Sequence, residues 1–254
     1  MASGLVILDK PSGLTSFECV EKVKDIYKEK KAGHTGTLDC KVTGVLLILI
    51  GEARKLAVFF EKAKKTYIGT MHLHKDASES SIREVLKKFT GEITQIPPVR
   101  SRVKRVPRKR KIYKLQIMEI KGRDVVLLIE SDHGVYIRKL MHDIGEKLGT
   151  GAHMTALRRI GVNGFTEKEA VSLEDLKKNK EKYLIPNEKI IESLKIPKIK
   201  VPKDKEQRIR NGLPFAIKNK KLKDNEKVAI FVENKLLAIG VVKGKKIKIN
   251  RVLN

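Results

Sequence analysis

A short loop rich in glycine and threonine, Gly33 to Asp39, constrains this chain more than any other stretch. It follows a basic segment with helical character and precedes the apolar run Val45 to Ile50, which the pattern predicts to be a buried strand. Two glycines and two threonines let the backbone approach a ligand closely. If the lone carboxylate of Asp39 is buried and ionised, it needs a cationic partner. Taken alone, the same residues more often mark a capped turn.

The charge of the chain points to a polyanionic partner. Its 254 residues, enough for one large and one small domain, contain 56 Lys and Arg against 30 Asp and Glu, a formal net charge of +26. Such an excess attracts nucleic acid, with an affinity that falls as salt rises. An acidic membrane surface is the alternative, but no long amphipathic helix or lipidation signal supports it. The segment Arg100 to Lys111 concentrates the positive charge locally.

Cysteine usage and hydropathy bear on the compartment. The two cysteines, Cys19 and Cys40, have no paired spacing, which fits a reducing environment without a disulfide framework. Asp9 and Lys10 interrupt the N-terminal apolar run too early for a signal peptide, and no apolar segment reaches transmembrane length. We therefore expect an intracellular protein.

Periodicity and turn residues predict a mixture of strands and helices over the first three quarters of the chain. The expected strands are Leu5–Leu8, Val45–Ile50, Lys65–His74, Leu115–Ile120 and Asp124–Glu130. The expected helices are one capped by Thr15 or Ser16, one over Ser81–Phe89, and one from Arg138 that ends at Gly149–Gly151.

A second domain is predicted after Ile196-Pro197. The expected division is residues 1–195 and residues 196–254. Four short strands surround one helical segment, Asp204 to Asn211, which suggests a compact barrel. The strands are Lys198–Val201, Val228–Val232, Leu236–Val242 and Ile247–Val252.

Several motifs in one order carry a family resemblance. The loop at 33–39, with Asp9-Lys10-Pro11 before it and Tyr136-Ile137-Arg138 and Asp143-Ile144-Gly145 after it, resembles the TruB and dyskerin family of RNA pseudouridine synthases. The likeness runs from about Gly4 to Arg159 and more weakly to the C-terminus. It implies an α+β fold, with a mixed, mostly antiparallel sheet and flanking helices. The C-terminal barrel resembles a shortened PUA domain, an RNA-binding module.

The family's reaction turns uridine into pseudouridine by breaking a C–N bond, rotating the base and forming a C–C bond to the same sugar. No electrons or groups enter or leave, so no redox cofactor or metal is expected. A nucleophile and a pocket for a flipped base are needed. The resemblance places the nucleophile on Asp39 and leaves open whether it attacks the uracil ring or the sugar.

The resemblance also assigns the residues around the nucleophile. Tyr67 matches the aromatic residue that stacks on the flipped base, and Arg138 the arginine that pairs with the aspartate. Leu157 matches an apolar wall of the pocket, His34 a histidine near the flipped nucleotide, and Lys10 a lysine that serves the loop. Without the family, Tyr67 and Leu157 are ordinary strand and core residues. RNA contacts are expected from Arg100, Arg102, Lys104, Arg105, Arg158 and Arg159.

Three other interpretations are weaker. His72 and His74 could face one side of a strand and bind a metal, but no third ligand has suitable spacing. Residues 149–154 lack the third glycine of a dinucleotide-binding loop and follow a helix rather than a strand. Cys40 could suggest a thiol nucleophile, although it stands where the family usually has proline and bears on the rigidity of the loop.

The residues of three motifs favour the archaeal and eukaryotic dyskerin branch of the family. The segments at 71–74, 97–105 and 151–154 resemble that branch, which implies a box H/ACA guide RNA and the small partner proteins Nop and Gar. The chain begins almost at its first motif, so we expect it to lack the extension that wraps the PUA domain. Standalone modification of the tRNA T-loop is therefore the competing enzymatic interpretation. A non-catalytic RNA-binding or ribosome-assembly protein is the alternative from another class. The location would be cytoplasmic in an archaeon and nucleolar in a eukaryote.

Overall fold

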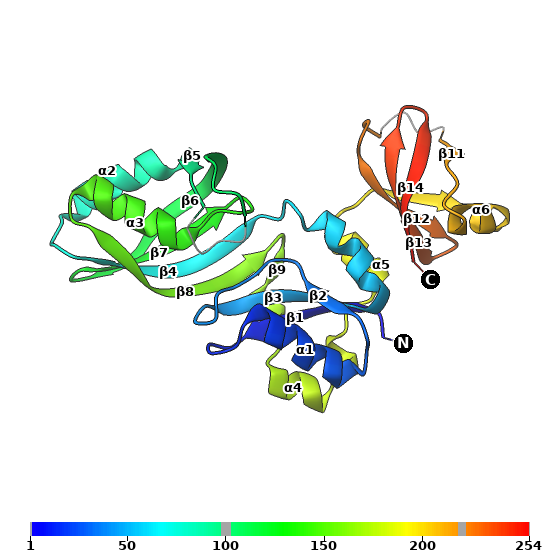
Figure 1. Cartoon of the computed structure of the whole chain (residues 1–254), viewed down its shortest axis with the longest axis horizontal. Helices are drawn as coiled ribbons and strands as arrows, with labels where there is room; N and C mark the ends of the chain where they lie inside the picture. The colour runs from blue at the N-terminus through cyan, green and yellow to red at the C-terminus, as the bar shows by residue number, and fades with distance from the viewer. Residues whose placement is uncertain (1, 98–102, 218–221, 254) are drawn as a thin grey trace.

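Two β-sheets joined by short helices make up the chain (Figure 1). The computed structural model describes residues 2–97, 103–217 and 222–253. The strands of the first sheet are β1 (Gly4–Lys10), β2 (Ala32–His34), β3 (Thr43–Ile50), β4 (Lys65–Leu73), β5 (Gly91–Gln95), β6 (Arg108–Lys121), β7 (Asp124–Ser131), β8 (Ala152–Val162) and β9 (Phe165–Thr166). Their order is β1-β3-β8-β4-β7-β6-β5, with β2 beside β3 and β9 beside β8.

The first sheet is antiparallel except at one junction. Within the described residues, β3 and β8 run parallel and pair only through Thr43 with Arg158 and Gly44 with Arg159. The β1–β3 half and the β8–β4–β7 half thus meet along a seam two residues long. Gly44 has a φ of +103°, and a Cβ there would lie 2.2 Å from the Arg159 carbonyl oxygen, so the seam requires glycine. This topology confirms the expected mixed, mostly antiparallel sheet.

Sequence patterns predict neither β5 nor β8. The strand β8 bulges twice against β4, between the partners of Thr66 and Tyr67 and between those of Thr70 and Met71. Each bulge adds one residue and reverses the side on which the following side chains lie, so the two-residue period is lost. The strand β5 is a short edge strand of five residues, too short to show a period.

Three helices cover the first sheet. Thr15 caps α1 (Ser16–Tyr27) in a reciprocal box with Glu18, as expected. The helices α2 (Glu79–Phe89) and α3 (Ile137–Leu148) lie on one face of β4, β7 and β6 (Figure 1) and share a hydrophobic core with them. Gly149, at a φ of +75°, ends α3. In the described ranges, no helix is long and apolar enough to cross a membrane.

The C-terminal part forms a second, five-stranded sheet. Two short helices, α4 (Leu173–Lys178) and α5 (Asn187–Ser193), precede it. Its elements are β10 (Lys198–Val201), α6 (Glu206–Arg210), β11 (Phe215–Ala216), β12 (Lys227–Val232), β13 (Lys235–Lys243) and β14 (Lys246–Val252). The strand order is β10-β12-β13-β14-β11, a curled half-barrel where the pattern predicts a compact barrel. The expected helix shortens to α6 after a 3₁₀ turn at Lys203–Lys205.

The two sheets share one hydrophobic cluster. It joins Leu49 and Ile190 of the first part to Phe231 and Ile239 of the second. Polar contacts reinforce it: Lys227 Nζ donates to the Val58 carbonyl at 2.8 Å, and Lys55 Nζ donates to that of Val252 at 2.7 Å. The division at residues 195 and 196 stays a prediction, and this shared core couples the stability of its two sides.

This coupling predicts different consequences for two buried phenylalanines of the second sheet. Phe231→Ala removes a ring from the shared cluster and is expected to cost about 3–5 kcal/mol of stability. It should also speed amide hydrogen exchange in α5, which packs on that cluster. Phe215→Ala is the matched control, because its ring belongs to a separate cluster made only of residues after position 198. Unchanged exchange in α5 of the Phe231→Ala protein would contradict the coupling.

Candidate active site

Hydrogen bonds attach the loop that ends at Asp39 to the start of α1. The buried Ser16 Oγ accepts the Leu38 N–H at 2.8 Å and donates to the Leu38 carbonyl at 3.1 Å. The Gly13 N–H donates to the Cys40 carbonyl at 3.1 Å. Both neighbours of Asp39 are therefore held by their backbone, while its carboxylate stays exposed. Asp39 therefore differs from an ordinary surface aspartate in its fixed backbone position and not in the burial of its carboxylate.

Lys10 also holds the backbone of the loop that ends at Asp39. Its side chain is fully buried and donates to the Pro11 carbonyl at 2.8 Å and the Cys40 carbonyl at 3.0 Å. Burial lowers the pKa of its ammonium, and Arg159 contributes in the same direction. Lys10 thus fixes the backbone next to Asp39, and a part in substrate binding stays a prediction.

The structure pairs Asp39 with Arg138 across 99 positions of sequence. Arg138 Nη2 forms an ion pair with Asp39 Oδ2, and both side chains remain more than half exposed. Arg138 lies in the first turn of α3, where the helix dipole disfavours a cation, so local helix stability does not explain its place. The buried Gln95 fixes the start of this helix by accepting the Tyr136 N–H at 3.0 Å and donating to the Tyr136 carbonyl at 3.3 Å.

Arg159 is the central buried group of the site. Its side chain, 1 % exposed, donates to the carbonyls of Val45 at 2.7 Å, Gly36 at 3.0 Å and Thr37 at 3.4 Å. It also interacts with the Tyr67 hydroxyl. A guanidinium buried in this way is not available to RNA phosphates, so the RNA contact predicted for Arg159 is wrong. It connects the loop to β4 instead.

Tyr67 and His34 lie near this arginine, and Leu157 precedes it by two residues in β8. The Tyr67 ring belongs to the core under α3, and burial raises the pKa of its hydroxyl against the opposing effect of Arg159. His34 is partly buried, and burial together with Arg159 lowers its pKa, so its ring is neutral at pH 7. Its buried Nδ1 has no hydrogen-bond partner among the described residues. Leu157 lies in β8 opposite Gly69 and packs partly buried against the same core.

Lys65 opens β4 two residues before Tyr67, so both side chains lie on one face of the strand. Its Nζ donates to the Ala63 carbonyl at 2.8 Å. Its Cε lies 3.5 Å from the point where a Cβ of Gly36 would sit. Desolvation, followed by Arg159, lowers the pKa of Lys65 to about 8, and Asp132 opposes this effect. The sequence gives no signal for this lysine, because its strand position resembles that of any polar residue.

The remaining predicted RNA contacts divide into three groups. Lys104 and Arg105 are exposed, as such a role requires. Arg158 forms ion pairs with Asp9 at 2.9 Å and Glu167 at 2.8 Å, which join β8 to β1 and to the turn after β9. Arg100 and Arg102 lie outside the described residues.

Features that suggest other chemistry have structural explanations. His74 Nε2 and His153 Nδ1 lie 2.9 Å apart in a hydrogen bond, and His72 Nδ1 lies 2.7 Å from Asp124 Oδ1. In the part of the chain that the structure describes, no group of His, Cys, Asp or Glu is arranged to hold a metal. Cys40 is an exposed free thiol whose carbonyl, rather than its sulfur, takes part in the loop contacts.

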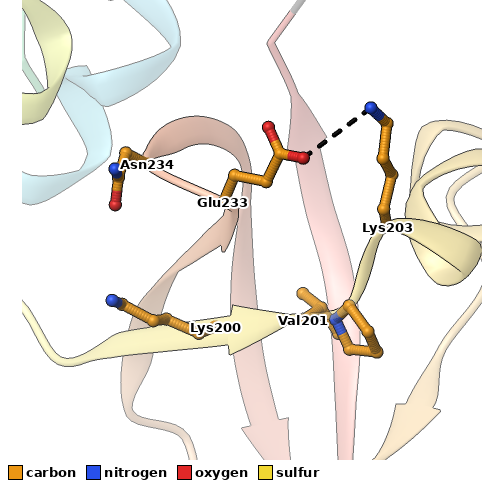
Figure 2. Close-up of a pocket in the computed structure, with 6 residues that line it drawn as sticks. Lys200, Val201, Lys203, Glu233 and Asn234 are labelled. Atoms are coloured by element: carbon orange, nitrogen blue, oxygen red, sulfur yellow. Dashed lines mark ion pairs between the residues drawn. The ribbon is translucent and has the colours of Figure 1, made fainter.

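A separate hollow lies on the second sheet. Figure 2 shows it between the end of β10 and the β12–β13 turn, where Lys203 forms an ion pair with Glu233 at 3.7 Å. Its volume is about 390 Å³. Its lining residues are Lys200, Val201, Pro202, Lys203, Glu233 and Asn234. All of them belong to the second sheet and its turns, so the hollow is not part of the site at Asp39.

Two family models match the chain. The N-terminal domain of TruB family pseudouridylate synthases matches residues 24–137, and the C-terminal domain of tRNA pseudouridylate synthase B matches residues 138–194. A probable tRNA pseudouridine synthase B of Archaeoglobus fulgidus is 41 % identical over 93 % of this chain and 78 % of its own length. That of Nanoarchaeum equitans is 54 % identical over 68 % of this chain and 49 % of its own length. The chain thus spans about half the length of the first curated relatives that it matches.

Solved structures agree over nearly the whole chain. The crystal structure of a Cbf5–Nop10–Gar1 complex contains a chain with a TM-score of 0.87 and 37 % identity, covering 99 % of this chain and 85 % of its own. The structure of an H/ACA RNP bound to a substrate RNA containing 2′-deoxyuridine gives a TM-score of 0.86 and 34 % identity, with coverage of 99 % and 85 %. The arrangement of both sheets therefore has close counterparts.

The lowered pKa of Lys65 predicts a pH-dependent gain in stability for Lys65→Met. A lysine with a folded-state pKa of about 8 and an ordinary value of 10.5 binds fewer protons folded than unfolded between these limits, so wild-type stability rises with pH there. Below pH 8 the full cost of burying the charge is present. The variant should be more stable than wild type by roughly 1–3 kcal/mol at pH 7, and the gap should shrink towards pH 10.5. Denaturant unfolding of both proteins across this pH range measures the difference in their free energies of unfolding. A difference that stays constant with pH would contradict the lowered pKa of Lys65.

Proposed function

Because this chain belongs to the TruB family of pseudouridylate synthases, we propose that it isomerises uridine to pseudouridine in RNA, with Asp39 as the nucleophile. The observation that supports this most is the Asp39–Arg138 ion pair. It joins the one carboxylate of the 33–39 loop to an arginine in the first turn of a helix, where the dipole disfavours a cation. A non-catalytic RNA-binding or ribosome-assembly protein has no need for this pairing.

The proposed reaction breaks one bond and forms another at the same sugar carbon. The N1–C1′ bond breaks, the uracil turns, and the C5–C1′ bond forms. C5 then loses a proton and N1 gains one, so atoms and electrons balance without a cofactor. Asp39 must be ionised to attack either the ring or the sugar, and Arg138 favours the ionised form and orients it.

The groups around Asp39 have complementary roles in this proposal. In this proposal Tyr67 stacks on the base, which requires its ring, only 7 % exposed in this structure, to become accessible when RNA enters, and Leu157 supplies an apolar wall. The neutral ring of His34 can occupy space vacated by the flipped nucleotide without adding charge. Lys10 and Arg159 hold the backbone on both sides of Asp39 and are positioning residues. Gln95 has the same function for Arg138, through Tyr136.

For the substrate we favour a uridine chosen by a box H/ACA guide RNA, with Nop10- and Gar1-like partner proteins. The likeness to chains solved in a Cbf5–Nop10–Gar1 complex and in an H/ACA RNP supports this choice. The C-terminal half-barrel after residue 195 is the proposed RNA-binding domain, with exposed Lys104 and Arg105 as further contacts. The second candidate is standalone action on the tRNA T-loop, which the names of the sequence relatives favour.

Asp39→Asn should abolish pseudouridine formation and leave RNA affinity nearly unchanged. Asparagine has almost the same shape but is a poor nucleophile, and phosphate contacts elsewhere dominate affinity. Quantifying pseudouridine in treated RNA and measuring the dissociation constant in parallel separates the two effects. Cys40→Ser is the matched control next to Asp39 and should remain active. Appreciable turnover by Asp39→Asn would refute the nucleophile.

The two substrate classes predict opposite results in a reconstitution. If the protein is guide-dependent, it alone should modify few RNAs. An H/ACA guide with its partner proteins should then direct it to the uridine that the guide leaves unpaired. Rapid modification of tRNA by the protein alone, with no gain from guide RNA, would favour the standalone enzyme instead.

A further inference from the structure

Lys65 is a partly buried cation with unused hydrogen-bonding capacity. An ammonium has three N–H donors, and within the described residues only one of them has a partner, the Ala63 carbonyl at 2.8 Å. No carboxylate of these residues lies within ion-pair distance of its Nζ. Removing a cation from water without such partners is costly, and a lysine with a pKa perturbed in this way is a candidate for a functional role.

The groups around Lys65 leave a local excess of positive charge. Arg159 of β8 acts on it unfavourably, and Asp132, after β7, acts favourably but also accepts hydrogen bonds from His133. The other titratable groups near Arg159 are Lys10, His34 and Tyr67. None of these three brings a negative charge at pH 7. An incoming anion would therefore meet little repulsion here.

Buried polar atoms on the same side also lack partners. Ser131 lies directly opposite Lys65 in the β4–β7 register, and its Oγ is buried without a hydrogen bond among the described residues. The buried Nδ1 of His34, two residues before Gly36, also has no hydrogen-bond partner among the described residues. Such atoms have unused capacity for a further hydrogen bond. His34 belongs to the 33–39 loop, whose Gly36 carbonyl accepts from Arg159 and whose Gly36 lies beside the Lys65 side chain.

We propose that Lys65 is a substrate-binding residue whose ammonium receives a phosphodiester oxygen of the nucleotide that enters beside Tyr67. The inference rests on the proposed function, since it places an RNA strand at this loop. A phosphodiester fits better than a uracil carbonyl because it brings a full negative charge to a site with uncompensated positive charge. The role is binding rather than chemistry, and Lys65 is distinct from the Asp39–Arg138 pair.

Binding of an anion at Lys65 has a measurable signature in pH. A phosphate beside the ammonium raises its pKa back towards the ordinary lysine value, so binding takes up a proton above pH 8. If the pKa returns to about 10, affinity should fall roughly tenfold between pH 7 and pH 9 from this group alone. An arginine in its place stays protonated over that range and should remove the dependence.

The test measures dissociation constants of the full chain for a fluorescent T-loop hairpin RNA at pH 7 and pH 9. Wild type should lose about tenfold, Lys65→Arg should be nearly flat, and Lys65→Met should be weak at both pH values. Lys64→Met is the matched control: its neighbouring side chain is exposed, lies over the Tyr113 ring and pairs with Glu130, so the wild-type pH dependence should persist. Persistence of the pH dependence in Lys65→Met would overturn the proposal.

Two further measurements isolate the assignment. A single neutral methylphosphonate is introduced in turn at each phosphate around the target uridine. At one of these positions the difference in affinity between wild type and Lys65→Met should disappear. An advantage that survives at every position would overturn the phosphate assignment. Pseudouridine formed by wild type at pH 7, both on the T-loop hairpin alone and in the reconstitution with guide RNA and partner proteins, tests the proposed function separately. RNA binding with the expected pH profile but pseudouridine in neither assay would refute the function and leave the Lys65 contact intact.

Discussion

The contacts of one buried guanidinium, that of Arg159, hold this site together. It donates to the carbonyls of Gly36, Thr37 and Val45 and interacts with Tyr67, so it joins the loop, the strand after it and the strand of the proposed base-stacking residue. Burying a cation whose hydrogen bonds go mainly to carbonyls costs stability. In exchange, these hydrogen bonds hold the loop in one backbone geometry. Because these hydrogen bonds fix the backbone of the loop, the Asp39 carboxylate can be exposed and still hold a defined position.

The local positive charge and the proposed chemistry belong together. Lys10, Lys65 and Arg159 place three basic side chains beside the backbone of the loop that carries the exposed Asp39 carboxylate. Burying them lowers stability, and in the proposed function the return is the binding of an anion, a trade-off common at functional sites.

Periodicity and turn residues predicted helices α1 to α3 and the strands β10 and β12 to β14, whereas the mixed α+β sheet and the pairing of Arg138 with Asp39 were expected from the family resemblance. They could not predict β8, because two bulges remove its alternation, nor the burial of Arg159, because adjacent arginines look alike in sequence. Gln95 was not singled out, and Ser16 was expected only as a possible helix cap rather than as a partner of the Leu38 backbone. Each acts through hydrogen bonds to backbone groups distant in sequence, and such contacts leave no local pattern. The shared core of the two sheets is equally invisible before the fold is known.

The narrow seam between β3 and β8 has a mechanical consequence. Asp39 is carried by the β1–β3 half of the sheet, whereas Tyr67 and Arg138 are carried by the half around β4 and its helices. Backbone pairing joins these halves through two residue pairs only, and the side chains of Arg158 and Arg159 in β8 add contacts to Asp9 and to the 33–39 loop. The separation of the Asp39 carboxylate and the Arg138 guanidinium therefore depends on the few contacts that cross this seam.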